Sequence, residues 1–269
     1  MVRALQVLCP LYIYPSDCGV SRDLCAWKPL YETLEANPGV QFTLVINPNS
    51  GPGDAAVPDS NYIAAVATVN ALANVKTVGY VRSTWGARPV GEYQAEVTTY
   101  ANWATYPDAN IAVHGIFVDE ANNTASTLQY YTDFSNYAHS AFPSDDTLVV
   151  QNPGTPLDQS WFDAMPNDVF VTFEGFYANM FNDWTAYTDS RFADTPHQRQ
   201  ASIIHSFTGS TTDLVTVTDT TAELTDIKYI YVTTAEDYNS FPTNLDTFVA
   251  AVSGTNAWMA ANPESYPRV

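Results

Sequence analysis

The strongest constraint on the fold is a regular alternation of short apolar runs with longer segments of helical periodicity. Each apolar run has the length of a β-strand, and each gap leaves room for one helix. The runs occupy residues 5–14, 41–47, 77–82, 111–119, 147–151, 169–174, 201–206 and 227–232. Eight such repeats in a chain of 269 residues predict a (β/α)₈ barrel.

The intervening segments carry apolar side chains on one helical face. In the first of them, Trp27, Leu30 and Leu34 share a face, and a Pro-Gly pair follows at residues 38–39. Corresponding faces occur in residues 62–72, 93–103, 128–137, 161–165, 177–187, 212–224 and 245–259. The β-branched residues of 212–224 disfavour a helix there.

A doubly wound open sheet is the competing fold, since it also alternates strands with helices. That fold needs a Gly-rich phosphate turn after an early strand, and the sequence has no GxGxxG motif. No linker rich in Gly, Ser or Pro divides the chain. We therefore expect one barrel domain over residues 1–269.

Charge and hydropathy restrict the partners. The net charge is −19, with only 10 Lys and Arg residues, which argues against nucleic acid or an anionic membrane and favours a neutral or cationic ligand. No run of about 18 apolar residues exists, so we expect no membrane span. Aromatic residues reach 13%, which is common where sugar rings stack on side chains, although a plain core can also use them. We expect a monomer.

The three cysteines bear on the cellular location. Cys18 and Cys25 lie in one loop, where they can pair, whereas Cys9 lies in an apolar strand and is expected to be a buried thiol. A disulfide in the loop would indicate secretion, and two free thiols would indicate the cytosol. No signal peptide is visible, but the acidic, lysine-poor composition favours the disulfide and a secreted or cell-surface protein.

Two of the predicted strands end in acidic residues. The run 111–118 leads into Asp119 and Glu120, and the run 169–173 leads into Glu174. Barrel enzymes place their chemistry at the C-terminal ends of the strands, and a pair of carboxyl groups there is what acid/base cleavage of a glycosidic bond requires. The simpler interpretation is that acidic residues cap strands or helices, as they often do in acidic chains.

Other polar residues follow the strands and are candidate substrate contacts. They are Tyr12, Tyr14, Asn47, Arg82, Gln151, Asn152, Tyr177 and His205. Arg82 is one of few basic residues, and we expect it to pair with Asp119 or Glu120 and to keep a nucleophile ionised. The loop that begins at Asn47 is equally consistent with a rigid turn, and His205 with a structural role.

Other chemistries have little support. The four histidines show no HxH or HExxH spacing, and no third acidic residue completes a metal site with Asp119 and Glu120. No GxSxG motif marks a nucleophilic serine. We expect neither a metal nor a cofactor.

The chain resembles the spherulin-4 (spherulation-specific) family over essentially its whole length. The motifs that carry the resemblance are Asn47-Pro48-Asn49-Ser50-Gly51-Pro52-Gly53, Gly115-Ile116-Phe117-Val118-Asp119-Glu120 and Phe173-Glu174-Gly175. The resemblance implies a (β/α)₈ glycoside hydrolase that cleaves α-1,4-linked galactosaminogalactan internally, at stretches of N-acetylgalactosamine. It also implies that Asp119, Glu120 and Glu174 are essential.

The resemblance to barrel enzymes that act on α-linked sugars implies a retaining mechanism. We assign Asp119 as the nucleophile and Glu174 as the general acid/base, with Glu120 tuning Glu174 or binding a hydroxyl group. The alternative is that Glu120 protonates the leaving group. Two other functions stay open: a non-catalytic polysaccharide-binding or spore-coat protein, and a barrel glycosidase that acts on another polysaccharide.

Overall fold

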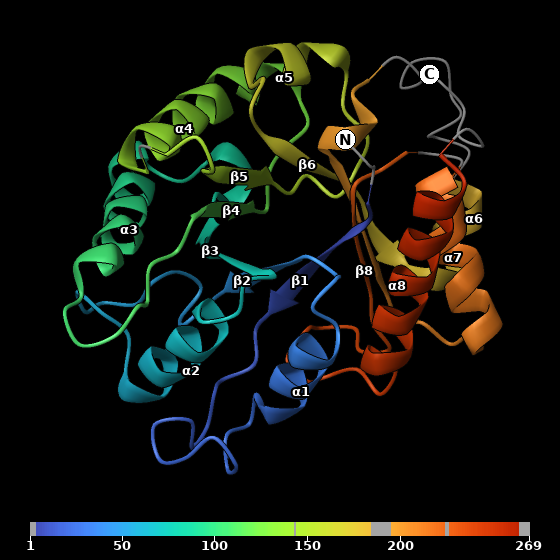
Figure 1. The fold of residues 1–269 in the computed structure, drawn as a ribbon. Helices are drawn as coiled ribbons and strands as arrows, with labels where there is room; N and C mark the ends of the chain where they lie inside the picture. Colours follow the sequence, from blue (N-terminus) through green and yellow to red (C-terminus); the bar gives the residue numbers. More distant parts are fainter. Residues whose placement is uncertain (1–3, 143, 184–194, 224–225, 264–269) are drawn as a thin grey trace.

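The computed structural model describes residues 4–142, 144–183, 195–223 and 226–263. Eight parallel strands close into a barrel in the order β1 to β8, and the helices lie around it (Figure 1). The predicted (β/α)₈ barrel is therefore confirmed. The strands are β1 (Gln6–Leu11), β2 (Phe42–Ile46), β3 (Val75–Arg82), β4 (Gly115–Asp119), β5 (Leu148–Gln151), β6 (Val169–Phe176), β7 (Gln200–His205) and β8 (Tyr229–Val232).

One α-helix follows each strand. The helices are α1 (Lys28–Ala36), α2 (Ser60–Asn70), α3 (Val90–Asn102), α4 (Leu128–Ala141), α5 (Gln159–Ala164), α6 (Tyr177–Asp183), α7 (Thr211–Glu223) and α8 (Leu245–Ala261). Short 3₁₀ turns lie at Thr84–Gly86, Trp103–Thr105, Ala125–Thr127 and His197–Arg199. Of the predicted helical segments, residues 184–187 and 224 lie outside the described residues.

Helix α7 forms despite its β-branched residues. Leu214, Val217, Thr218 and Thr221 are buried, and Thr255 of α8 donates to the hydroxyl oxygen of Thr218 at 3.0 Å. Packing against α8 therefore outweighs the weak helix propensity of the segment.

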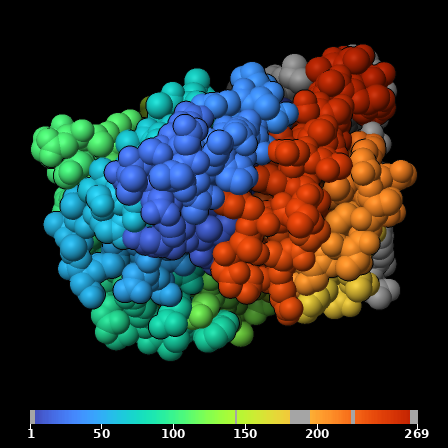
Figure 2. All heavy atoms as spheres, turned by 90° about the horizontal axis from the view of Figure 1, so that it is seen from below, coloured from blue at the N-terminus to red at the C-terminus, as the bar shows by residue number. Residues whose placement is uncertain are grey.

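The first and last elements of the chain close the ring. Strand β1 pairs in parallel with both β2 and β8, and α1 and α8 are in contact. Figure 2 shows the blue N-terminal segment against the red C-terminal segment. At the other end of α8, the Asn256 side chain accepts a hydrogen bond from Leu5 N at 2.7 Å and donates to Leu5 O at 2.9 Å. This end of α8 therefore lies beside the N-terminal end of β1.

Strand β4 begins later than the sequence predicts, at Gly115 instead of residue 111. Gly115 has φ of 147°, and a Cβ atom there would lie 1.9 Å from the carbonyl oxygen of Leu148. Only glycine permits this close approach of β4 to β5. The approach sets the register that carries Asp119 to the end of the barrel.

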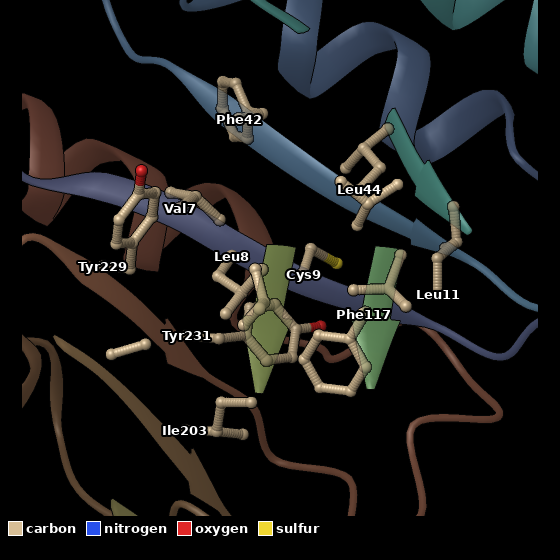
Figure 3. Close-up of a cluster of buried hydrophobic side chains, with 14 of the residues drawn as sticks. Val7, Leu8, Cys9, Leu11, Phe42, Leu44, Phe117, Ile203, Tyr229 and Tyr231 are labelled. Atoms are coloured by element: carbon tan, nitrogen blue, oxygen red, sulfur yellow. The ribbon is translucent and has the colours of Figure 1, made fainter. Parts of the chain in front are cut away.

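The core joins side chains of several strands. Figure 3 shows Cys9 of β1 among Leu44, Phe117 and Tyr231, which come from three other strands. Cys9 is a buried free thiol, and burial raises its pKa to about 12, an effect that a hydrogen bond with Tyr231 partly offsets. The thiol therefore stays protonated and unreactive.

The predicted loop disulfide is present. Cys18 and Cys25 are bonded to each other in the β1–α1 loop, as expected for a protein that folds in an oxidising compartment. Among the residues that the structure describes, no helix has the length and apolar character needed to span a bilayer.

Candidate active site

Three neighbouring strands bring Asp119, Asn152 and Glu174 together. Asp119 is the last residue of β4, Asn152 follows β5, and Glu174 lies near the end of β6. The amide nitrogen Nδ2 of Asn152 lies 2.8 Å from Asp119 Oδ1 and 2.7 Å from Glu174 Oε2. Because an amide nitrogen carries two hydrogens, Asn152 donates one hydrogen bond to each carboxylate.

The shared nitrogen limits the separation of the two acids. Asp119 Oδ1 and Glu174 Oε2 lie no further apart than the two hydrogen bonds laid end to end, about 5.5 Å. Retaining glycosidases hold their carboxyl groups about 5–5.5 Å apart, whereas inverting enzymes need about 6.5–9.5 Å to admit a water molecule. The geometry fits the retaining arrangement.

Glu174 is held by residues far from it in sequence. The hydroxyl of Tyr238, in the loop after β8, donates to Glu174 Oε1 at 2.6 Å. Burial raises the pKa of Glu174, and the negative charge of Asp119 raises it further, while the hydrogen bonds from Tyr238 and Asn152 lower it. The net direction is upward, which suits a carboxyl group that must carry a proton.

Asp119 has donors on both of its carboxylate oxygens. The Tyr80 hydroxyl, on β3, donates to Oδ2 at 2.8 Å, and Asn152 donates to Oδ1. The backbone is fixed as well, because both the amide and the hydroxyl of Ser83 donate to Asp119 O, at 3.0 Å and 2.9 Å. These contacts suit an anionic carboxylate in a fixed position.

Tyrosines line the space around the two acids. The ring of Tyr12 meets those of Tyr80 and Tyr238 edge-on, with centroids 5.3 Å and 5.8 Å away. Burial raises the pKa of the Tyr12 hydroxyl, and the charges of Asp119 and Glu174 raise it further. Tyr12, a predicted substrate contact, therefore lies within the electrostatic reach of both acids.

Glu120 has a different environment from Asp119. Its backbone is left-handed, with φ of 53°, and its Oε2 is buried and accepts no hydrogen bond in the described part of the chain. Oε2 lies 3.9 Å from Arg82 Nε, so the predicted pairing of Arg82 is with Glu120. Burial raises the pKa of Glu120, Arg82 lowers it, and Asp119 raises it.

Several predicted substrate contacts lie outside this cluster. Gln151 is buried, and its amide donates to Asp168 Oδ2 at 3.0 Å, because adjacent residues of a strand point to opposite faces. The Asn47 side chain accepts from Gly51 N at 3.2 Å and so braces its own loop. The Tyr14 hydroxyl donates to Asp59 Oδ2 at 3.0 Å, beside the start of α2.

The remaining two candidates lie beyond Glu174 in the strand order. His205 ends β7, and its ring lies 4.4 Å from Phe176 and 6.3 Å from Tyr238, centroid to centroid. Burial lowers the pKa of His205, and Glu236 partly offsets this. The ring of Tyr177 packs against Phe207 at 4.5 Å. His205 therefore borders the cluster through Tyr238.

The structure adds Tyr80 and Tyr238 to the site. Tyr80 lies within an apolar strand, so its sequence context indicates a core residue. Tyr80 and Arg82 are two positions apart on β3 and therefore share a face, and this spacing is the sequence feature that could have indicated Tyr80. Tyr238 is 64 residues from Glu174 in sequence and lies in an irregular loop, so no local pattern indicates its position. No group of three or more His, Cys, Asp or Glu residues in the described ranges is placed to hold a metal ion.

A closed barrel with two acids at the ends of its strands has the architecture of glycoside hydrolases. Comparison with known proteins gives the family: residues 6–252 match the model of spherulation-specific family 4, and the chain belongs to that family. The predicted family resemblance is thereby confirmed.

Two relatives are informative. Spherulin-4 of Physarum polycephalum is 36% identical over 183 residues, which are 68% of this chain and 48% of that protein. The chain thus spans about half the length of this curated relative. The crystal structure of Aspergillus clavatus Sph3 in complex with GalNAc superposes with a TM-score of 0.82 at 31% identity, over 93% of this chain and 98% of that one.

Proposed function

We propose that this protein is a retaining glycoside hydrolase that cleaves a polysaccharide chain internally. The observation that carries the proposal is the Asn152 amide nitrogen, which contacts both Asp119 and Glu174 and so keeps the two contacted oxygens within about 5.5 Å of each other. This limit supports a retaining pair. Family membership and the likeness to a GalNAc-bound barrel support it.

The roles follow from the two environments. Asp119 attacks the anomeric carbon while Glu174 protonates the leaving oxygen, which breaks the glycosidic bond and leaves the sugar covalently attached to Asp119. Glu174, now ionised, takes a proton from water, and the resulting hydroxide displaces Asp119 from the sugar. The first step needs an anionic Asp119 and a protonated Glu174, and the raised pKa of Glu174 favours it as the acid.

The surrounding donors assist both steps. Tyr80 and Asn152 keep the Asp119 carboxylate in one orientation, and Tyr238 stabilises Glu174 once it has lost its proton. Glu120, whose Oε2 lies 3.9 Å from Arg82 Nε, is proposed to accept a hydrogen bond from a sugar hydroxyl. Tyr12 and His205 are proposed to contact the bound sugar.

The substrate proposed is an α-1,4-linked polymer that contains N-acetylgalactosamine. The GalNAc complex of the Aspergillus clavatus relative supports this sugar, and the net charge of −19 suits a neutral or partly deacetylated, cationic chain. The Cys18–Cys25 disulfide supports a secreted or cell-surface location, where such a polymer is found.

The test is the release of reducing ends from a panel of polysaccharides that includes partly N-acetylated α-1,4-galactosaminogalactan. We expect oligosaccharides from that polymer, and we expect Asp119→Asn and Glu174→Gln each to lower the rate by several powers of ten while melting curves show folded protein. Turnover by a folded Asp119→Asn variant at the wild-type rate would exclude the assignment. Binding of the polymer without cleavage by the wild-type protein would favour the non-catalytic alternative.

A further inference from the structure

Three consecutive residues after β3 have left-handed backbones. Thr84, Trp85 and Gly86 have φ values of 50°, 51° and 82°. Glycine adopts this conformation freely, but a β-branched threonine and a bulky tryptophan rarely do. Such strain persists only where the surrounding structure imposes it, and it concentrates at functional sites.

Hydrogen bonds from the candidate active site impose this conformation. Trp85 N donates to Glu120 O at 2.8 Å, and the Asn122 side chain donates to Trp85 O at 3.2 Å. Within the turn, Gly86 N donates to Ser83 O at 3.2 Å. Ser83 also holds the backbone of Asp119, so the turn and the nucleophile share one support. The backbone of Trp85 is therefore fixed beside the strand end that carries both acids.

The turn presents an apolar ring to solvent. Trp85 is 59% exposed, although Trp27, Trp103 and Trp161 are buried. Trp85 follows β3, and its backbone contacts Glu120, the residue after Asp119. Phe176, two residues beyond Glu174 at the end of β6, is 43% exposed and packs against His205. Exposed aromatic residues thus occur after β3 and at the end of β6.

We propose that the Trp85 ring is the stacking surface of a sugar subsite on the β3 side of the carboxylates, and that the left-handed turn serves to present it. The inference rests on the proposed function and adds a residue that positions the bound polymer relative to the two carboxylates. A sugar ring offers apolar C–H faces that pack on an aromatic ring, which explains an exposed tryptophan on a fixed backbone. An enzyme that cleaves internally must hold sugars on both sides of the scissile bond, and Trp85 supplies one side.

The test uses a variant that removes the ring but keeps the turn. Asparagine tolerates the left-handed conformation, so Trp85→Asn deletes the stacking surface without unfolding the loop, and Trp85→Tyr retains a ring. The matched control is Trp258→Ala, which removes a tryptophan that is 42% exposed on α8. Trp258 lies near Asn256, at the opposite end of the barrel.

Binding of partly N-acetylated α-1,4-galactosaminogalactan is measured for each variant in a Glu174→Gln background, and KM and kcat are measured in the active background. We expect Trp85→Asn to weaken binding and to raise KM about tenfold or more, with kcat nearly unchanged. Trp85→Tyr should recover most of the loss, and Trp258→Ala should behave as its parent. Unchanged affinity and KM in a folded Trp85→Asn variant would overturn the subsite.

The two proposals fail separately. If the wild-type protein cleaves the polymer and Trp85→Asn leaves KM and affinity unchanged, the hydrolase stands and the subsite falls. If the wild-type protein cleaves nothing, but Trp85→Asn weakens its binding of the polymer, the subsite stands and the hydrolase falls. A lower melting temperature with unchanged affinity would assign Trp85 a structural role only and would also overturn the subsite.

Discussion

Two adjacent residues, Gln151 and Asn152, have different roles although they differ by one position in the sequence. Both are buried amides. Gln151 donates to Asp168, a fully buried carboxylate that also accepts from Ser135 at 2.9 Å and contacts His139 Nε2 at 2.8 Å. Asn152 donates to the two acids of the candidate site. The first amide supports the fold, and the second holds the two acids of the proposed catalytic pair.

This difference predicts opposite effects of the two alanine substitutions. Asn152→Ala should lower kcat/KM by about two orders of magnitude, because a single preorganised donor in an active site has an effect of that size. Gln151→Ala should leave kcat/KM unchanged but lower the free energy of unfolding by about 1–3 kcal/mol, since it leaves Asp168 short of a donor. Steady-state kinetics and urea unfolding measure the two quantities, and equal kinetic losses in both variants would refute the distinction.

Tyr238 is predicted to set the pH range of the reaction. Its hydrogen bond lowers the pKa of Glu174, so Tyr238→Phe should raise that pKa. Because the general acid must be protonated in the free enzyme, kcat/KM falls as the pH rises above this pKa. The alkaline limb of the pH profile should therefore move to higher pH in the Tyr238→Phe variant.

Tyr100→Phe is the control for this measurement. The Tyr100 hydroxyl is buried and donates to Ile46 O at 3.0 Å, so the variant loses a tyrosine hydrogen bond to a neutral carbonyl group instead of one to an acid. Its alkaline limb should coincide with that of the wild-type protein. A shift of the Tyr238→Phe limb to lower pH would show that Glu174 is not the group whose protonation controls the rate.

At the scale of elements, the β1–α1 loop depends on a covalent link. The Cys18–Cys25 disulfide closes a loop of seven residue steps, which by loop entropy contributes about 2 kcal/mol to the free energy of unfolding. The double variant Cys18→Ala, Cys25→Ala should lose about that amount in urea unfolding. Alkylation of the denatured, unreduced protein should label Cys9 alone in mass spectrometry. Labelling of all three cysteines would contradict the link.

The strands and helices were predictable where buried side chains recur at a regular spacing along the sequence. The apolar runs marked all eight strands because parallel barrel strands are covered on both sides. Their ends were less certain: β6 continues to Phe176, two residues beyond Glu174, and has an irregularity between Val171 and Phe173. A backbone irregularity of this kind depends on pairing with β7, which no local pattern of residues expresses.

At the scale of the whole molecule, the two acids were predictable from the sequence, but the loop residues around them were not. Asp119 and Glu174 were predictable because each follows an apolar run at the end where barrels carry their chemistry. Tyr238 and Trp85 were not, since both lie in loops, have left-handed backbones and reach the site only once the barrel has closed. Gln151 was predicted from its position at a strand end, and the alternation of side chains places it on the other face.

The stereochemistry of the first product tests the central claim, that Asp119 and Glu174 act as a retaining pair. Proton NMR follows the anomeric signals while the wild-type protein cleaves α-1,4-linked N-acetylgalactosamine oligomers, before the released sugar mutarotates. Two successive displacements at one carbon preserve its configuration, so the account predicts that the α-anomer forms first. Initial release of the β-anomer would mean a single displacement by water and would contradict the assignment of Asp119 as the nucleophile.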